Sequence, residues 1–216
     1  MRGEIKTIML PGPAGRLESL LNVGEEDAKY ASLICHPHPL HGGTIHNKVV
    51  YNAMKALTAF GFHALRFNFR GTGLSEGVHD EGRGEQDDVR AAIDYLDKEF
   101  HLPIIFAGFS FGASTGLRAT CPDSRVVGAI SLGTPVLVDG RAYTYKFLHN
   151  CNKPKLLLSG DADPYSPRHE LESVFASAAD PKKLVFTPNA GHFFEGQLPA
   201  MQAEITTWVN EVILQS

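Results

Sequence analysis

The sequence lacks the features that mark membrane-spanning and nucleic-acid-binding proteins. Its 216 residues carry a formal net charge of −4, and lysine and arginine are scattered with no run of them. We therefore expect neither nucleic acid nor a membrane surface as a partner. No stretch approaches the roughly 20 apolar residues of a membrane span, and the first residues contain no apolar run typical of a signal peptide. Both absences predict a cytoplasmic location.

Cysteine is scarce as well. Cys35, Cys121 and Cys151 form an odd number with no C-x-x-C spacing, which indicates neither a disulfide framework nor a thiolate metal site. We expect reduced, partly buried thiols. Internal repeats, low-complexity segments and linker-like tracts are also missing, so residues 1–216 are predicted to form one domain.

Short apolar runs alternate with segments of helical period, which is the pattern of βα units laid into a mostly parallel sheet. The predicted fold class is α/β, a three-layer sandwich around an eight-stranded sheet. Buried strands are expected at 31–35, 63–68, 104–108, 126–132, 155–159 and 183–187, with an antiparallel hairpin of 5–10 and 17–22 at one edge.

Helices are expected around 50–57, 89–96 and 201–212, where apolar residues recur at i, i+3, i+4 and i+7. Residues 136–153 are the least regular part of the chain and fit either a short helix or a substrate-facing loop. The segment between the strands expected at 126–132 and 155–159 is too short to hold a large lid. The pattern therefore predicts an open site.

One motif carries the chemistry, the G-x-S-x-G of residues 108–112, which lies directly after an apolar strand and before a helix. In that setting the serine lies on a sharp turn that presents its hydroxyl above the sheet edge. Ser110 also lies at a helix N-terminus, where the helix dipole favours developing negative charge. In a chain with 21 glycines the five letters alone fit an ordinary turn equally well.

The order of the remaining groups favours catalysis. α/β-Hydrolases supply serine, acid and histidine in that order, each at the C-terminal end of a strand. His192 follows the strand expected at 183–187, and both Asp161 and Asp163 follow the strand expected at 155–159. We expect Asp163, further into the loop, to orient the histidine, and Asp161 to cap the turn through backbone amides. The predicted triad is Ser110, Asp163 and His192.

An oxyanion hole requires two backbone N–H groups, and Phe111, directly after the nucleophile, is expected to supply the first. The second should come from the loop after residues 31–35. Because Pro37 and Pro39 have no N–H, His38 is the candidate there and Leu40 the alternative.

Two other patterns point to different chemistry. Histidines at 36, 38, 41 and 46 permit a metal site, but no carboxylate follows at a fitting spacing, so we expect none. A G-x-G at Gly71 and Gly73 permits dinucleotide binding, but the third glycine is displaced to Gly77 and no helix begins at once. We interpret that segment as a loop that braces the active site.

Together, the segments HPHPLHGGTIHNKVV, LRFNFRGTGLSEG, GFSFG, LLLSGDADPYSP and NAGHFF resemble the short, lid-less bacterial α/β-hydrolases related to dienelactone hydrolase and the CocE/NonD group. The resemblance runs from about residue 5 to 213. It implies the same triad, with His38 and Phe111 at the oxyanion positions. Dienelactone hydrolases carry cysteine at the elbow where this chain has Ser110, so their substrate is not implied.

The predicted function is hydrolysis of small or medium carboxylic esters through an acyl-enzyme, with no metal or organic cofactor. The expected partner is a small ester-like molecule. An amide- or peptide-cleaving enzyme and a non-catalytic binding protein of the same fold are the alternatives. The residues expected to line the substrate site are Leu40, Tyr143, Tyr145, Phe193 and Phe194.

Overall fold

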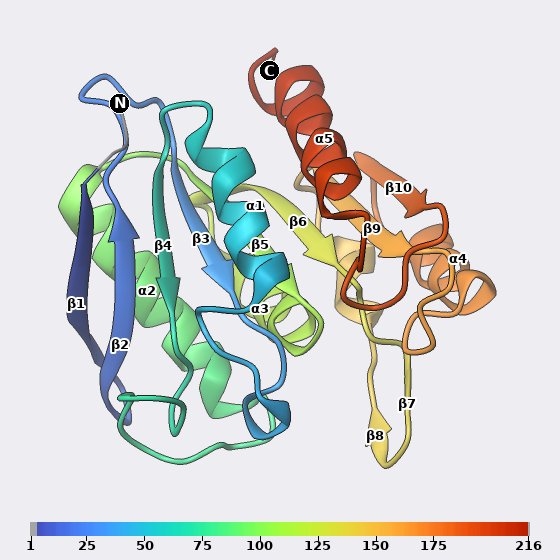
Figure 1. The fold of residues 1–216 in the computed structure, drawn as a ribbon, viewed down its shortest axis with the longest axis horizontal. Coiled ribbons are helices and arrows are strands. Elements are labelled where there is room, and N and C mark those ends of the chain that lie inside the picture. Colours follow the sequence, from blue (N-terminus) through green and yellow to red (C-terminus); the bar gives the residue numbers. More distant parts are fainter. Residues whose placement is uncertain (1–3, 216) are drawn as a thin grey trace.

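The structure, a computed structural model, describes residues 4–215 and is built around one eight-stranded sheet (Figure 1). The strands of this sheet are β1 (Ile5–Gly12), β2 (Gly15–Asn22), β3 (Ala31–Cys35), β4 (His63–Phe67), β5 (Ile104–Phe109), β6 (Val126–Leu132), β9 (Lys155–Gly160) and β10 (Lys182–Thr187). Their order is β1-β2-β4-β3-β5-β6-β9-β10, antiparallel from β1 to β4 and parallel from β4 to β10. The predicted fold class, with no large lid, is confirmed.

Helices cover both faces of the sheet, and each face buries its own apolar cluster. On one face α1 (Lys48–Thr58) packs against α5 (Leu198–Trp208), which continues into a π-turn at Val209–Ile213. On the other face α2 (Gly84–Phe100) packs against α3 (Phe111–Thr120). Because strands between two helical layers are buried on both sides, their sequences are uniformly apolar.

Two elements differ from the sequence prediction. The hairpin ladder of β1 and β2 extends to the pair Gly12 and Gly15, because Gly15 takes a φ of 121° that lets the chain reverse within two residues. Helix α4 (Arg168–Ser177) was not predicted. It buries only Leu171 among its ten residues and so has little apolar periodicity to detect.

Residues 136–153 were expected to form either a short helix or a loop, and they form a mixture of elements instead. They contain a small hairpin of β7 (Leu137–Val138) and β8 (Arg141–Ala142), followed by a 3₁₀ turn at Lys146–Asn150. In Figure 1 this hairpin projects beyond the edge at which the parallel strands end. The segment therefore borders the carboxyl ends of the strands, where ligands bind in open α/β sheets.

The expectation that the cysteines are reduced is wrong for two of them. Cys121 and Cys151 form a disulfide, with a Cα–Cα distance of 5.4 Å that lies in the usual range. The bond joins the C-terminal end of α3 to the end of the 3₁₀ turn. The two residues are 30 positions apart in the chain, so their spacing carried no sign of the bond. Cys35 is free and buried, and burial raises the pKa of its thiol.

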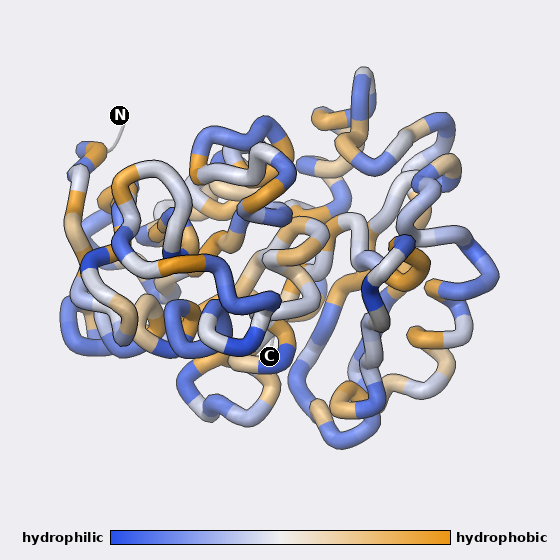
Figure 2. The backbone as a smooth tube through the Cα atoms, turned by 90° about the horizontal axis from the view of Figure 1, so that it is seen from below, coloured by the Kyte–Doolittle hydropathy of each residue, from blue (hydrophilic) through white to orange (hydrophobic). Residues whose placement is uncertain are grey.

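Viewed from below, hydrophilic residues predominate along the outermost loops (Figure 2). Among residues 4–215, no helix combines the length and the apolar character needed to cross a membrane.

Candidate active site

Ser110 lies on the turn between β5 and α3, where its backbone adopts a φ of 54° and a ψ of −119°. Positive φ is rare for a residue with a side chain and marks strain that the surroundings must hold. A Cβ at Gly108 would lie 2.6 Å from the carbonyl oxygen of Gly112, and a Cβ at Gly112 would lie 2.4 Å from that of His36. Both glycines of the motif are therefore sterically required.

The three predicted triad residues lie in one hydrogen-bonded chain. Nε2 of His192 is 2.9 Å from Oγ of Ser110, and Nδ1 of His192 is 2.8 Å from Oδ2 of Asp163. A carboxylate only accepts hydrogen bonds, so Nδ1 donates to it and Nε2 is left to accept the serine proton. His192 and Asp163 are buried, whereas Ser110 is half-buried and reaches a cavity.

The structure separates the two aspartates more sharply than the sequence did. Oδ1 of Asp163 accepts the amide of Tyr165 at 2.9 Å, and its Oδ2 also accepts Oγ of Ser159 at 3.2 Å. Asp161 is exposed, and within residues 4–215 its carboxylate makes no hydrogen bond. The expectation that Asp161 caps the turn is wrong, because Asp163 makes the turn bond as well as the histidine bond.

The two candidate oxyanion residues have their side chains in contact. Phe111 is the first residue of α3, where amides have no acceptor within the helix, and the rings of Phe111 and His38 are 4.8 Å apart. The amide of Leu40, the alternative donor, bonds instead to Nδ1 of His38 at 3.1 Å. The amides of Phe111 and His38 therefore remain the predicted pair.

His36 joins the loops that follow β3 and β4. Its Nδ1 donates to the carbonyl of Pro37 at 2.6 Å, and its Nε2 accepts the amide of Phe69 at 3.0 Å. Both ring nitrogens are used, and burial lowers the pKa of His36 to about 4, so the ring is neutral. Within residues 4–215, no three His, Cys, Asp or Glu side chains gather into a metal-binding group.

Acid should destabilise the fold through these histidines. Burial lowers the pKa of His36 to about 4 and, together with the nearby Arg141, that of His38 to about 3, whereas unfolded histidine titrates near 6.5. As the pH falls from about 6.5 towards 4, the unfolded chain takes up protons that the folded chain does not. The free energy of unfolding should then drop by up to about 1.4 kcal/mol per pH unit for each histidine.

Urea titrations at about pH 7.5, 5.5 and 4.5 measure this slope. The variant His36→Gln should flatten it, whereas His169→Gln, which changes an exposed ring, should keep the wild-type slope. A wild-type free energy of unfolding that is constant over this range would contradict the assignment.

Two adjoining cavities lie near the serine, and Ser110 lines the smaller of them. The smaller, of about 170 Å³, is lined by Ser110, His192, Tyr165 and Phe193 among others. The larger, of about 540 Å³, adjoins it, because His38, Arg141 and Tyr143 line both.

Three of the residues expected to line the site do so: Leu40 lines the larger cavity, Phe193 the smaller one and Tyr143 both. The expectation is wrong for Tyr145 and Phe194, which are 4% and 0% exposed and line neither cavity. The hydroxyl of Tyr145 donates to the carbonyl of Pro135, and Phe194 packs in the core beneath α5. Both aromatic rings therefore pack in the interior and do not face the substrate cavities.

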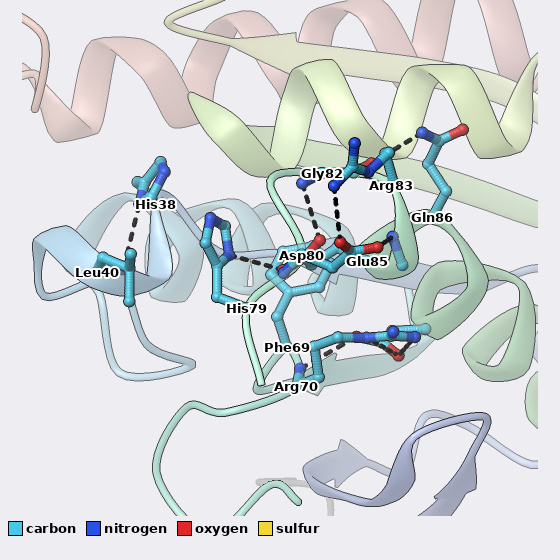
Figure 3. Close-up of polar contacts among 12 residues, drawn as sticks. His38, Leu40, Phe69, Arg70, His79, Asp80, Gly82, Arg83, Glu85 and Gln86 are labelled. Carbon is cyan, nitrogen blue, oxygen red and sulfur yellow. Dashed lines mark hydrogen bonds and ion pairs between the residues drawn. The ribbon is translucent and has the colours of Figure 1, made fainter. Parts of the chain in front are cut away.

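Two buried acids of α2, Glu85 and Asp88, hold the loop after β4, and Figure 3 shows Glu85 among its partners. Glu85 accepts the amides of Asp80 and Gly82 at 2.8 Å each, and its Oε1 lies 2.6 Å from Nδ1 of His79. Asp88 binds the guanidinium and the backbone amide of Arg70. This agrees with the bracing role predicted for the segment.

Sequence reasoning missed Arg118 and Arg141, which line the larger cavity. They lie on α3 and β8, and the contact of Arg118 with Thr144, just after β8, holds the two elements at one cavity. No spacing rule connects positions on such separate elements.

Comparisons with known proteins agree with this geometry. Residues 38–147 match the family model described as serine aminopeptidase, S33. A lid-less α/β serine hydrolase of Xanthomonas campestris superposes with a TM-score of 0.85 at 31% identity, covering 96% of this chain and 94% of that one. An α/β serine hydrolase homologue of Coxiella burnetii gives a TM-score of 0.84 at 34% identity, covering 96% and 97%.

A protein of Rickettsia prowazekii is 37% identical over 158 residues, which are 72% of this chain and 66% of that protein. This chain covers about half the length of further curated relatives, for example 53% of a protein of Salmonella typhimurium. The chain thus spans about half to two thirds of the curated relatives that it matches.

Proposed function

Because the chain belongs to the hydrolase family described as serine aminopeptidase, S33, and to the lid-less α/β serine hydrolases, we propose that it cleaves small or medium carboxylic esters through an acyl-enzyme. The observation that carries this proposal is the unbroken chain from Ser110 through His192 to Asp163, at 2.9 and 2.8 Å, open to a cavity at the serine.

In the proposed reaction, Oγ of Ser110 attacks the ester carbonyl while Nε2 of His192 takes its proton. The amides of Phe111 and His38 bind the oxyanion of the tetrahedral intermediate. The C–O bond to the alcohol then breaks, and the alcohol leaves with the proton from His192. Water repeats the sequence on the acyl-enzyme and releases the acid, with Asp163 holding the imidazole throughout.

The short segment between β6 and β9 supports small or medium substrates, since it holds only the β7–β8 hairpin and a 3₁₀ turn. The kinship with dienelactone hydrolase and the CocE/NonD group, which the motifs imply, is part of the proposal. Ser110 stands where dienelactone hydrolases carry the elbow cysteine, which argues for esters other than the dienelactone.

Amide cleavage is the second candidate, favoured by the description of the matched family as serine aminopeptidase. The same triad serves both reactions, so substrate preference decides between them. Comparing kcat/KM for 4-nitrophenyl butyrate with that for an aminoacyl 4-nitroanilide measures this preference. A higher value for the anilide would replace the ester proposal.

A fluorophosphonate should modify the protein at Ser110 alone, because among residues 4–215 it is the serine whose hydroxyl is hydrogen-bonded to a histidine ring. Mass spectrometry of the digested adduct locates the site. The variant Ser110→Ala should take up no label, whereas Ser114→Ala, a change four residues further along α3, should still be labelled. An adduct on Ser75, Ser114 or Ser166 with Ser110 untouched would exclude the proposed nucleophile.

A further inference from the structure

The larger cavity beside the serine is bordered by three arginines from separate parts of the chain. Arg83 lies just before α2, Arg118 in the last turn of α3 and Arg141 in β8. Among the residues that line this cavity, the acid is Glu81. A chain with a net charge of −4 thus concentrates positive charge at one place, next to its candidate nucleophile.

Two of these arginines have no acidic partner in the part of the chain that the structure describes. Arg83 pairs with Asp80 at 3.1 Å, so its charge is balanced. Arg118 donates to the carbonyl of Thr144 and lies 4.8 Å from the ring of Phe147, and neither partner carries charge.

Nη2 of Arg141 lies 3.4 Å from Nε2 of His41, and the proximity of Arg141 also favours the charged form of Tyr143, although burial raises the pKa of that hydroxyl overall. Within residues 4–215, neither Arg118 nor Arg141 forms an ion pair with a carboxylate. A guanidinium has five N–H donors, so each arginine keeps donors to offer a ligand.

Three uncharged polar groups among the lining residues also suit an anion. The hydroxyls of Ser114 and Thr115 lie on the first turns of α3, and the side chain of Gln86 lies on the facing helix. Glu85, which does not line the cavity, contacts the amides of Asp80 and Gly82 and the ring of His79 (Figure 3). The positive charge also affects His38. Burial is the main cause that lowers the pKa of His38, and Arg141 and the neighbouring histidines lower it further.

The position of His192 identifies which half of an ester would enter this cavity. The alcohol must leave beside His192, which protonates it, and His192 lines the smaller cavity. The larger cavity is lined by both candidate oxyanion residues, His38 and Phe111, and by neither Ser110 nor His192, and it joins the smaller cavity on the side where His38 lies. The acyl chain therefore extends from Ser110 into the larger cavity.

We propose that the substrates are esters whose acyl chain ends in an anionic group, such as a carboxylate, bound by Arg118 and Arg141. This inference rests on the proposed ester hydrolysis. Arginine pairs with carboxylates through two parallel hydrogen bonds, which gives both affinity and orientation.

A matched pair of substrates tests it. The 4-nitrophenyl hemiester of adipic acid and 4-nitrophenyl hexanoate have the same chain length and differ in the terminal carboxylate. Adipate is chosen because the carboxylates of the succinate and glutarate hemiesters attack their own ester groups. We expect kcat/KM to be about 10- to 100-fold higher for the hemiester, since bonds to charged groups carry that much discrimination, and added salt to reduce the difference.

Variants locate the effect. Arg118→Gln and Arg141→Gln should each lower the hemiester-to-hexanoate ratio of kcat/KM by about tenfold, and Arg118→Lys should retain part of it. Arg90→Gln removes an exposed arginine of α2 that pairs with Asp87, and should leave the ratio unchanged. Equal kcat/KM values in the wild type, or a ratio that neither Gln variant lowers, would overturn the inference.

A second pair tests the acyl side. If 4-acetoxybenzoate, with its anionic leaving group, is preferred over phenyl acetate while the adipate hemiester has no advantage, the anion belongs to the alcohol and the inference is overturned.

Binding separates this inference from the proposed function. Adipic acid monoamide should bind the Ser110→Ala protein in a calorimetric titration, and should lose that binding when Arg118→Gln and Arg141→Gln are added. Absence of binding, or binding that survives both changes, overturns the anion site. Absence of fluorophosphonate labelling and of turnover, with binding intact, would instead remove the proposed hydrolysis.

Discussion

We expect Asp163→Asn to retain the fold and to lower kcat by about 10⁴, as the same change does in serine proteases with this arrangement. The amide of asparagine donates to Nδ1 of His192, so the ring proton moves to Nε2 and the ring cannot accept the proton of Ser110. The carbonyl oxygen of the asparagine can still accept the amide of Tyr165, the bond that holds the turn. Steady-state kinetics on the preferred ester, together with the thermal midpoint, measures both effects.

Asp161→Asn is the matched control, since it makes the same chemical change two residues away. The Asp161 side chain is exposed, so its replacement should alter the free energy of unfolding by less than about 0.5 kcal/mol and leave kcat unchanged. If Asp161→Asn abolishes turnover while Asp163→Asn stays active, the two aspartates must exchange roles. If neither variant loses activity, the acid lies elsewhere.

The positions of these groups could be predicted because a topological rule places them. A parallel sheet carries its chemistry at the carboxyl ends of its strands, and the apolar runs that mark the strands are visible in the sequence. Ser110, Asp163 and His192 each follow such a run, so chain order alone brought them together. The sequence did not determine which way the side chains of Asp161 and Asp163 point. The hydrogen bond that holds the turn was therefore assigned to Asp161, although Asp163 makes it.

The lining of the site was harder to predict because it depends on packing between distant segments. Tyr145 and Phe194 have the aromatic character of lining residues, yet tertiary contacts place both in the interior. Arg118 and Arg141 line one cavity, where Arg118, on α3, contacts Thr144, just after β8. The disulfide between Cys121 and Cys151 lies near the same junction and was equally invisible in the spacing of the cysteines.

Beneath this site lies the ion pair that anchors the loop after β4. Asp88, fully buried on α2, accepts three hydrogen bonds from the guanidinium of Arg70, at 2.7 Å for the shortest, and one from its backbone amide at 3.0 Å. Its neighbour Asp87 pairs with Arg90 at 2.5 Å, but both of those side chains are about half exposed. One helix thus offers two adjacent Asp–Arg pairs that differ in burial.

Replacing Asp88 by alanine should lower the free energy of unfolding by about 3–5 kcal/mol, because the charge of Arg70 is left buried without its partner. Asp87→Ala should cost about 0–1 kcal/mol, since water replaces an exposed partner at little cost. Urea titrations of both variants measure the difference. Adding Arg70→Met to Asp88→Ala should recover part of the loss, because it removes the stranded charge. Equal losses for Asp87→Ala and Asp88→Ala would mean that burial does not set the strength of the Arg70 pair and that the loop is held by Glu85 instead.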